Sequence, residues 1–258
     1  MKQAGPHSRP SEKEGAAPPE DRSTTEYFDS YAPEYSVGRL QFAADFIKAQ
    51  ARPDSSLIDI GCGVGNTLEY LVGVAGISRA AGMDVSAKCL EQTQRRLPCT
   101  TYQGSILDHE LVRSVEDRFD FAVLAAILHH LIGKNRRDSK EYARMAISHT
   151  LELVRPGGYV VIHEPIYAPR AVTTAVFWVK KALTTITSHR VQVAGPWANI
   201  GPPVVSYLTN EELLGMAQAD PRGSVVDTDI SSSQPPLLAR PVLRRWNTTV
   251  IVGRDAAG

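Results

Sequence analysis

The residues with the clearest chemical pattern lie between Leu57 and Asn66, where the chain reads Leu-Ile-Asp-Ile-Gly-Cys-Gly-Val-Gly-Asn. Gly61, Gly63 and Gly65 follow a short apolar run, and glycine lets the backbone approach a ligand closely because it has no Cβ. In open α/β sheets, a turn that links a strand to a helix in this way lies at the ligand-binding edge. The pattern therefore predicts a site for a bound cofactor.

Two classes of ligand compete for this turn. Dinucleotides require G-x-G-x-x-G, but here Asn66 stands where the third glycine of that fingerprint would be. Asp59, two residues before the first glycine, would repel a pyrophosphate and suits a cationic ligand without phosphate. The pattern therefore disfavours a dehydrogenase, and tight NAD binding would reverse this interpretation.

The sequence D-x-G-x-G-x-G that begins at Asp59 resembles motif I of the class I S-adenosylmethionine-dependent methyltransferases. Other landmarks of that family follow in order: Asp84 after the next strand, the run Phe119–Leu124, the segment Ile127-Leu128-His129-His130-Leu131, and the turn Arg155-Pro156-Gly157-Gly158. The similarity covers roughly residues 24–165 and, by topology only, the last two strands. It implies S-adenosylmethionine as the cofactor.

The resemblance also implies which residues bind this cofactor. Asp84 would accept hydrogen bonds from both ribose hydroxyls. The family usually has Gly-Asp after the third strand, where this chain has Gly104-Ser105; Ser105 would supply one hydrogen bond, and Ile106 and Val85 would pack on the adenine. The predicted cofactor-binding residues are Tyr35, Asp59, Gly61, Gly63, Gly65, Asp84, Val85, Ser105, Ile106 and Ala125.

Histidines near the same edge are candidate general bases. His129 and His130 are adjacent, so at most one is expected to face the site if they open a helix. His163 and Glu164 end a predicted strand at the ligand-binding edge. The predicted catalytic candidates are His129, His130 and His163, of which one or two would act, and the predicted substrate contacts are Glu164, Trp178 and Trp197. Cys62 is interpreted as a small filler, not a nucleophile.

Alternating strands and helices must position these residues. The expected strands are 56–60, 80–85, 99–103, 119–127 and 159–163, with helices after Asn66, after Ser86 and from Asp138. Residues 224–230 and 246–252 alternate like strands, with no helix between them. The chain is therefore predicted to be α/β, a Rossmann-like, mostly parallel seven-stranded sheet with helices on both faces and a C-terminal antiparallel hairpin.

Two segments stand outside this alternation. Residues 1–22 are rich in proline and poor in large apolar residues, which predicts a disordered tail. Residues 23–258 are expected to form a single methyltransferase domain, with a helical substrate-cover insert at about 166–207. Within this insert, the helical stripe Val172, Ala175, Val176, Val179, Ala182, Leu183 and Ile186 is expected to pack on the protein.

Composition restricts the function further. Lysine plus arginine and aspartate plus glutamate are 28 each among 258 residues, which argues against a protein that neutralises nucleic-acid phosphates. No integral membrane segment or secretory signal is expected, and three scattered cysteines predict no metal site. The expectation is a cytoplasmic protein with a small-molecule substrate and no nucleic-acid partner, its oligomeric state left open.

The leading hypothesis is methyl transfer from S-adenosylmethionine to a small acceptor that is uncharged or modestly polar and partly hydrophobic, with oxygen preferred as the accepting atom. The sulfonium already activates the methyl group, so alignment of the reacting atoms is the main task. The alternatives are an RNA or protein methyltransferase, and a non-catalytic S-adenosylmethionine-binding partner protein.

Overall fold

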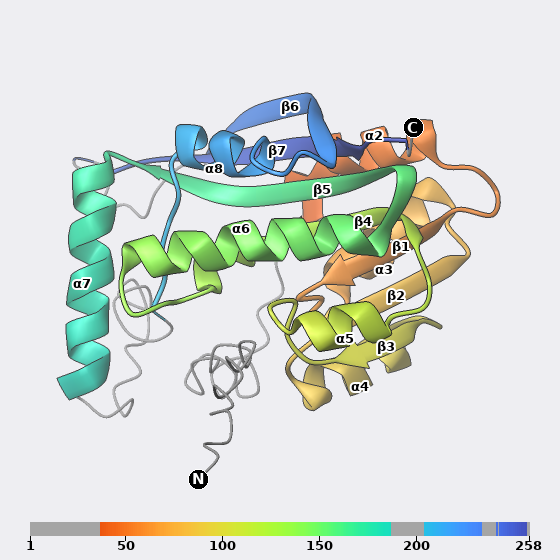
Figure 1. The fold of residues 1–258 in the computed structure, drawn as a ribbon, viewed down its shortest axis with the longest axis horizontal. Helices are drawn as coiled ribbons and strands as arrows, with labels where there is room; N and C mark the ends of the chain where they lie inside the picture. Colours follow the sequence, from red (N-terminus) through yellow and green to blue (C-terminus); the bar gives the residue numbers. More distant parts are fainter. Residues whose placement is uncertain (1–36, 187–203, 234–240, 242, 257–258) are drawn as a thin grey trace, which may run out of the picture.

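The computed structural model describes residues 37–186, 204–233, 241 and 243–256. Seven strands form one sheet in the order β3-β2-β1-β4-β5-β7-β6 (Figure 1). The strands are β1 (Ser56–Ile60), β2 (Arg79–Asp84), β3 (Thr100–Gln103), β4 (Phe119–Ala125), β5 (Val154–Ala168), β6 (Gly223–Ser233) and β7 (Arg244–Arg254). The helices are η1 (Val37–Leu40), α2 (Gln41–Gln50), α3 (Asn66–Ala75), α4 (Ala87–Arg96), α5 (His109–Ser114), η2 (Leu128–His130), α6 (Arg136–Leu153), α7 (Arg170–Ile186) and α8 (Asn210–Ala217).

The predicted fold class is confirmed. Strands β1 to β5 pair in parallel, whereas β7 pairs antiparallel with both β5 and β6. Because the parallel strands point the same way, their carboxyl ends meet at one edge of the sheet. Asp59, Asp84, Ala125 and His163 all lie at or near that edge.

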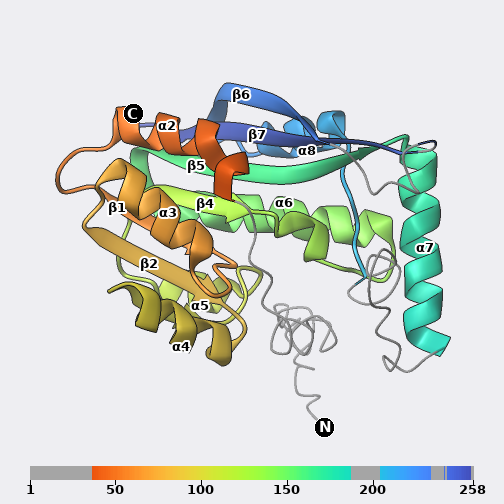
Figure 2. The same ribbon diagram turned by 180° about the vertical axis from the view of Figure 1, so that it is seen from behind.

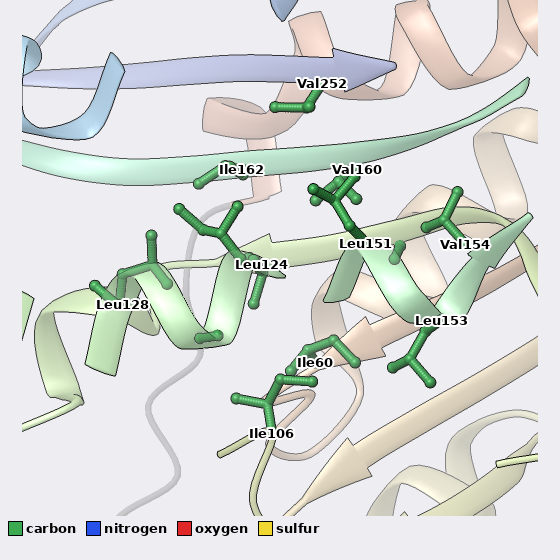
Figure 3. Packing of buried hydrophobic residues seen from close by; sticks show 14 of the residues in the cluster. Ile60, Ile106, Leu124, Leu128, Leu151, Leu153, Val154, Val160, Ile162 and Val252 are labelled. Atoms are coloured by element: carbon green, nitrogen blue, oxygen red, sulfur yellow. The ribbon is translucent and has the colours of Figure 1, made fainter. Parts of the chain in front are cut away.

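Each face of the sheet has its own apolar core. Ile58 and Ile60 face a core that also holds Ile106, Leu151 and Ile162, part of which Figure 3 shows. Leu57 and Phe121 face the opposite core, together with residues of α2 and α3. This division by alternate residues is what a strand buried on both faces requires. The two cores hold the strand ends, and hence the site, in place.

Strand β5 is much longer than the sequence pattern predicts. Its pairing with β4 ends at His163, but β7 continues to pair with it as far as Ala168. The helix of the insert expected at about 166–207 begins at Arg170, because the antiparallel partner extends β5 past the edge of the parallel sheet. Figure 2 shows β5 and β7 running side by side toward the end of α7.

Helix α7 faces the protein with residues other than those expected. Its buried face contains Thr173, Phe177 and Lys180, whereas Ala175 and Val179 of the predicted stripe are exposed. The sequence stripe was misleading because α7 is apolar on more than one side. Lys181 Nζ donates to the carbonyls of Gly133 and Lys134, at 2.9 and 2.6 Å, and so ties α7 to the loop before α6.

Helix α6 begins at Arg136, not at Asp138 as expected. The cap is Asn135, whose side chain accepts hydrogen bonds from the backbone N–H groups of Arg137 and Asp138. Asparagine at this position satisfies donors that have no partner inside the helix.

Among the described residues, no helix combines the length and apolar character needed to cross a membrane.

Candidate functional site

The glycine turn after β1 is built on three left-handed backbone positions. Gly61, Gly63 and Gly65 have φ values of 69°, 53° and 85°, which side chains with a Cβ rarely adopt. A Cβ at Gly63 would meet nothing within 4 Å, so this part of the turn borders open space. Helix α3 starts immediately after Gly65. The turn therefore presents bare backbone and a helix start to a ligand, as predicted.

Helix α4 packs against this turn and donates hydrogen bonds to its carbonyl groups, a contact that the sequence did not predict. Thr93 Oγ1 donates to the carbonyl of Gly63 at 2.8 Å, and Arg96 Nε donates to the carbonyl of Val64 at 3.0 Å. A Cβ on Gly65 would lie 2.9 Å from Thr93 Cγ2. Thr93 is a polar residue on the buried side of an amphipathic helix. Its polar side chain among apolar neighbours is the sequence signal that could have indicated its role.

Two aspartates flank the turn. Asp84 accepts hydrogen bonds from the backbone N–H of Gly63 through Oδ2 and from that of Ser86 through Oδ1, both at 2.9 Å. Asp59 is buried, and its Oδ2 has no hydrogen-bond partner among the described residues. Burial first, and then the charge of Asp84, raise the pKa of Asp59 to about 8. A cation bound beside these carboxylates would lower that pKa and be attracted by both.

These observations fit S-adenosylmethionine, which carries an ammonium, a sulfonium and a ribose diol. Asp84 would hold the ribose hydroxyls, the glycine turn would lie along the ligand, and the unpaired Asp59 oxygen suits its cationic end. The thiol of Cys62 is buried, and burial together with Asp59 and Asp84 raises its pKa, so the thiol stays protonated and fills space.

The other predicted cofactor residues lie in varied surroundings. The hydroxyl of Ser105 accepts a hydrogen bond from the backbone of Leu107 at 3.1 Å and so stabilises its own turn. Ile106 is only 3% exposed and packs in the core with Ile60, so little of its side chain is left for an adenine (Figure 3). Val85 is half-buried beside Asp84. Tyr35 lies outside the described residues.

The chain bends sharply where β4 ends. Ala125 closes the strand, and Ala126 has φ 61°, the one described non-glycine residue with a positive φ. Its N–H donates to the carbonyl of His163 at 2.7 Å. A strained backbone position persists only where its surroundings enforce it, and such positions cluster at functional sites. The bend turns η2, which carries the two adjacent histidines, toward the extension of β5.

His129 and Glu164 form a buried pair beyond this bend. His129 Nδ1 lies 2.6 Å from Glu164 Oε2, and Glu164 Oε1 accepts a hydrogen bond from the backbone N–H of Leu128 at 2.7 Å. Glu164 is 1% exposed and both of its oxygens have these partners, which argues against the substrate contact predicted for it. Burial raises the pKa of Glu164 to about 8 and lowers that of His129 to about 3. Burial thus favours the uncharged form of each partner.

Aromatic rings stack around His129. The ring centroid of His130 lies 4.1 Å from that of His129, so the two rings contact each other within the single short turn of η2. That at most one of them faces the site stays a prediction. His129 also stacks on Tyr207 at 5.3 Å, and Tyr207 contacts Tyr167 at 4.1 Å. No local pattern in the sequence marks either tyrosine.

His163 lies at the predicted edge and is buried. Its Nδ1 is 2.9 Å from Thr249 Oγ1 on β7, and its Nε2 has no hydrogen-bond partner in the described part of the chain. Burial, followed by the charge of Arg39, lowers its pKa to about 3. Its imidazole is therefore neutral at pH 7. It can donate or accept one hydrogen bond to a ligand through Nε2.

Three cations that the sequence analysis missed act on these histidines. After burial, Arg39 of η1, Lys180 of α7 and Arg245 of β7 contribute, in that order, to the lowered pKa of His129. Lys180 is 4% exposed, and burial lowers its pKa to about 8. These residues come from segments far apart in sequence, which is why no local pattern marked them.

Of the two predicted tryptophan contacts, the structure describes only Trp178. Trp178 is 50% exposed, and its neighbour Phe177, fully buried, faces the protein instead. The physical reason is the orientation of α7, which buries residues 173, 177 and 180. Trp197 lies outside the described residues.

Comparison with known proteins agrees with this geometry. A family model described as a methyltransferase domain matches residues 28–215, more than half of the chain. The N,N-dimethyltransferase of dTDP-3-amino-3,4,6-trideoxy-alpha-D-glucopyranose from Streptomyces venezuelae is 30% identical over 137 residues, 53% of this chain and 52% of that protein. The chain thus aligns with about half the length of this curated relative.

Solved structures share the fold. The magnesium protoporphyrin IX methyltransferase from Synechocystis PCC 6803 with bound SAM is 14% identical, with a TM-score of 0.58 over 93% of this chain and 100% of that one. The N-methyltransferase NodS from Bradyrhizobium japonicum with S-adenosylhomocysteine is 13% identical, with a TM-score of 0.56 over 91% and 99%. With the glycine turn, the paired aspartates and the matching domain model, the chain belongs to the methyltransferase domain family and is a class I S-adenosylmethionine-dependent methyltransferase.

Proposed function

We propose that this enzyme methylates a hydroxyl group of a small, partly hydrophobic acceptor, and that His129 takes the proton of that hydroxyl. The observation that carries the proposal is the 2.6 Å contact between His129 Nδ1 and Glu164 Oε2. A carboxylate at one ring nitrogen fixes the orientation of the imidazole and stabilises the positive charge that forms when the other nitrogen takes a proton.

The protonation of this pair decides when His129 can act. While Glu164 holds its proton, that proton is shared with Nδ1 and His129 Nε2 carries a hydrogen, so the ring can only donate. When the pair loses one proton, Nδ1–H faces the carboxylate and Nε2 becomes an acceptor. Because the two groups are strongly coupled, this loss belongs to the pair. The pKa of about 8 for Glu164 places the loss in the mildly alkaline range.

The surroundings suit a partly hydrophobic acceptor. The ring of Tyr207 stacks on His129 and contacts the ring of Tyr167, so aromatic surface lies beside the base. S-adenosylmethionine supplies a methyl group that is already activated. The residues of this chain bind and orient the two molecules and move one proton, which is the division of labour that proximity catalysis requires.

An amine acceptor is the second candidate, favoured by the relative from Streptomyces venezuelae, whose name states an N,N-dimethyltransferase activity on an amino sugar nucleotide. A neutral amine attacks without prior loss of a proton, so His129 would then matter little for the chemical step. RNA or protein substrates remain a third possibility, with no supporting observation among the described residues.

The test is methyl transfer from 13C-methyl-labelled S-adenosylmethionine to matched hydroxyl and amine acceptors, followed by mass spectrometry. We expect turnover of hydroxyl acceptors, with kcat about 10²- to 10⁴-fold lower in His129→Asn. His109→Asn is the matched control, because His109 also contacts a glutamate, Glu152, but lies on the surface with 49% of its side chain exposed. Turnover of amines alone, or full activity of His129→Asn, would contradict the proposal.

A further inference from the structure

The extension of β5 and β7 carries a row of polar side chains on one face. In antiparallel pairing, directly opposed residues share a face, and here His163 opposes Thr249, Pro165 opposes Asn247, and Tyr167 opposes Arg245. Two contacts verify this face: His163 Nδ1 to Thr249 Oγ1 at 2.9 Å, and the Arg245 guanidinium 5.6 Å from the centre of the Tyr167 ring.

The intervening residues face the other way. Ile162, Ile166 and Val250 lie in the core beneath α6 and α8, and Trp246 packs against that core. On the same face as the polar row, the next opposed pair toward the parallel sheet is Val161 and Ile251, which lie in the core beneath α2 and α3. The row His163, Asn247 and Arg245 is therefore the outer continuation of a buried sheet face, on the part of β5 and β7 that leads toward α7.

This polar row contains three buried atoms without hydrogen-bond partners in the described parts of the chain. They are His163 Nε2, Asn247 Oδ1 and Arg245 Nε. A buried polar atom without a partner costs about 1–3 kcal/mol, so native proteins rarely keep even one without a reason. Three on one strand-pair face indicate that a polar ligand completes them. The same face carries Tyr167, which contacts Tyr207, and Tyr207 stacks on His129.

The charge of the region indicates which ligand. Arg245 carries a permanent positive charge, and Arg39 and Lys180 also act on His129. Glu164, the carboxylate beside His129, is enclosed by His129 and the backbone of Leu128. Asp229 of β6 opposes Thr249, whereas Arg245 is opposed on β6 by Ser233, which carries no charge. Asp59 and Asp84 belong to the cofactor turn on β1 and β2. A positively charged region beside the reacting atoms complements an anion.

We propose that the row His163, Asn247 and Arg245 binds the acceptor, and that the acceptor bears an anionic oxygen group, a carboxylate or a phosphate, held by Arg245. The proposal builds on the proposed function by naming the class of acceptor. It replaces the uncharged acceptor expected from overall composition. The planar guanidinium donates in a fork that matches both kinds of anion. Asn247 and His163 would orient the uncharged part of the acceptor.

The test measures anion binding without turnover, so it stands apart from the test of the proposed function. Protein loaded with S-adenosylhomocysteine is titrated separately with sodium acetate and sodium phosphate, at constant ionic strength. Binding is followed by NMR through the Nε–H signal of Arg245 and the side-chain amide of Asn247. We expect saturable shifts with at least one anion, and the stronger of the two identifies carboxylate or phosphate.

Matched variants localise the effect. Arg245→Gln should weaken the stronger anion at least about tenfold, as loss of a charge-assisted hydrogen bond predicts, and Arg245→Lys should retain part of the affinity. Arg244→Gln removes the same charge one residue earlier, at an exposed position on the opposite face, and should change affinity less than twofold. Unchanged S-adenosylhomocysteine binding verifies that the variants fold.

Three results would overturn the proposal. The first is the absence of saturable shifts with either anion. The second is equal binding by wild type and Arg245→Gln, followed through Asn247. The third is an equal loss in Arg244→Gln, which would show a diffuse charge effect in place of a site.

Discussion

Asp84 is the residue on which we expect cofactor binding to depend most. Its two oxygens lie 2.9 Å from the backbone N–H groups of Gly63 and Ser86, so the carboxylate is held at the glycine turn before any ligand arrives. An oriented carboxylate binds a diol without the cost of ordering a flexible side chain.

Asp84→Asn keeps the size of the side chain and removes its charge. We expect S-adenosylhomocysteine to bind about 10- to 100-fold more weakly by calorimetry, because two charge-assisted hydrogen bonds become weaker. Asp54→Asn makes the same change at an exposed position and serves as the control. Wild-type affinity in Asp84→Asn would show that another residue binds the ribose.

The residues that could be predicted from sequence are those with a local signature. Asp59, Asp84 and the three glycines are marked by their spacing around predicted strands. Arg39, Lys180, Tyr207 and Arg245 are not, because only the folded chain brings η1, α7, the segment before α8 and β7 to one site. Glu164 was identified, but its role as the partner of His129 depends on a contact that no spacing encodes.

At the scale of elements, two glycines allow the effect of a left-handed backbone to be distinguished from the effect of blocking the ligand. Gly63 and Gly76 both have positive φ, and a Cβ at either would meet nothing within 4 Å. Gly63 lies in the glycine turn after β1, whereas Gly76 is the C-cap of α3, at the other end of that helix. A side chain at either position would strain the backbone, but only one at Gly63 would lie in the expected cofactor site.

We expect Gly63→Val to abolish S-adenosylhomocysteine binding, because its side chain fills the space into which the turn opens. Gly76→Val should leave binding intact, although both variants lose about 1–2 kcal/mol of stability from the left-handed backbone. Calorimetry measures the affinity, and urea unfolding measures the stability. Equal loss of affinity in both variants would contradict the assignment of the turn.

Helices and strands could be predicted where their bounds follow from the local apolar pattern and not from pairing with distant segments. The central strands are continuous apolar runs, and their predicted bounds lie within two residues of those observed. Strand β5 was cut short in the prediction because its outer half gains stability from β7, about 80 residues away along the chain. Helix α7 was found, but its inner face was misjudged because Phe177 and Lys180, not the valines, are buried.

For the molecule as a whole, buried titratable groups make stability depend on pH. The pKa values of Asp59 and Glu164 are raised to about 8, so their stabilising neutral forms are lost as pH rises toward 8. The pKa values of His129 and His163 are lowered to about 3, so stability falls as pH drops below their unfolded value of about 6.5. His130 is shifted in the same direction.

The raised carboxyl pKa values lower stability from about pH 4 to 8, and the histidines raise it up to about pH 6.5, so the ligand-free protein should be most stable near pH 6.5, where the contribution of the histidines is complete. Urea unfolding at pH 6.5, 7.25 and 8.0 should show a decline, because the unfolded state releases protons that the folded state keeps. Asp59→Asn removes one of the two groups and should reduce the slope by up to about 1.4 kcal/mol per pH unit. An unchanged slope in Asp59→Asn, equal to that of the exposed control Asp54→Asn, would contradict the raised pKa of Asp59.

The most direct test of the account is the protonation of His129 itself. Ring-15N NMR of the protein with bound S-adenosylhomocysteine, recorded from pH 6 to 9, reports which ring nitrogen carries hydrogen. We predict that Nε2 loses its hydrogen as pH passes about 8 while Nδ1 keeps one toward Glu164, and that Glu164→Gln abolishes this step. An Nε2 that titrates identically in Glu164→Gln, or that never loses its hydrogen, would contradict the role of His129 as the base.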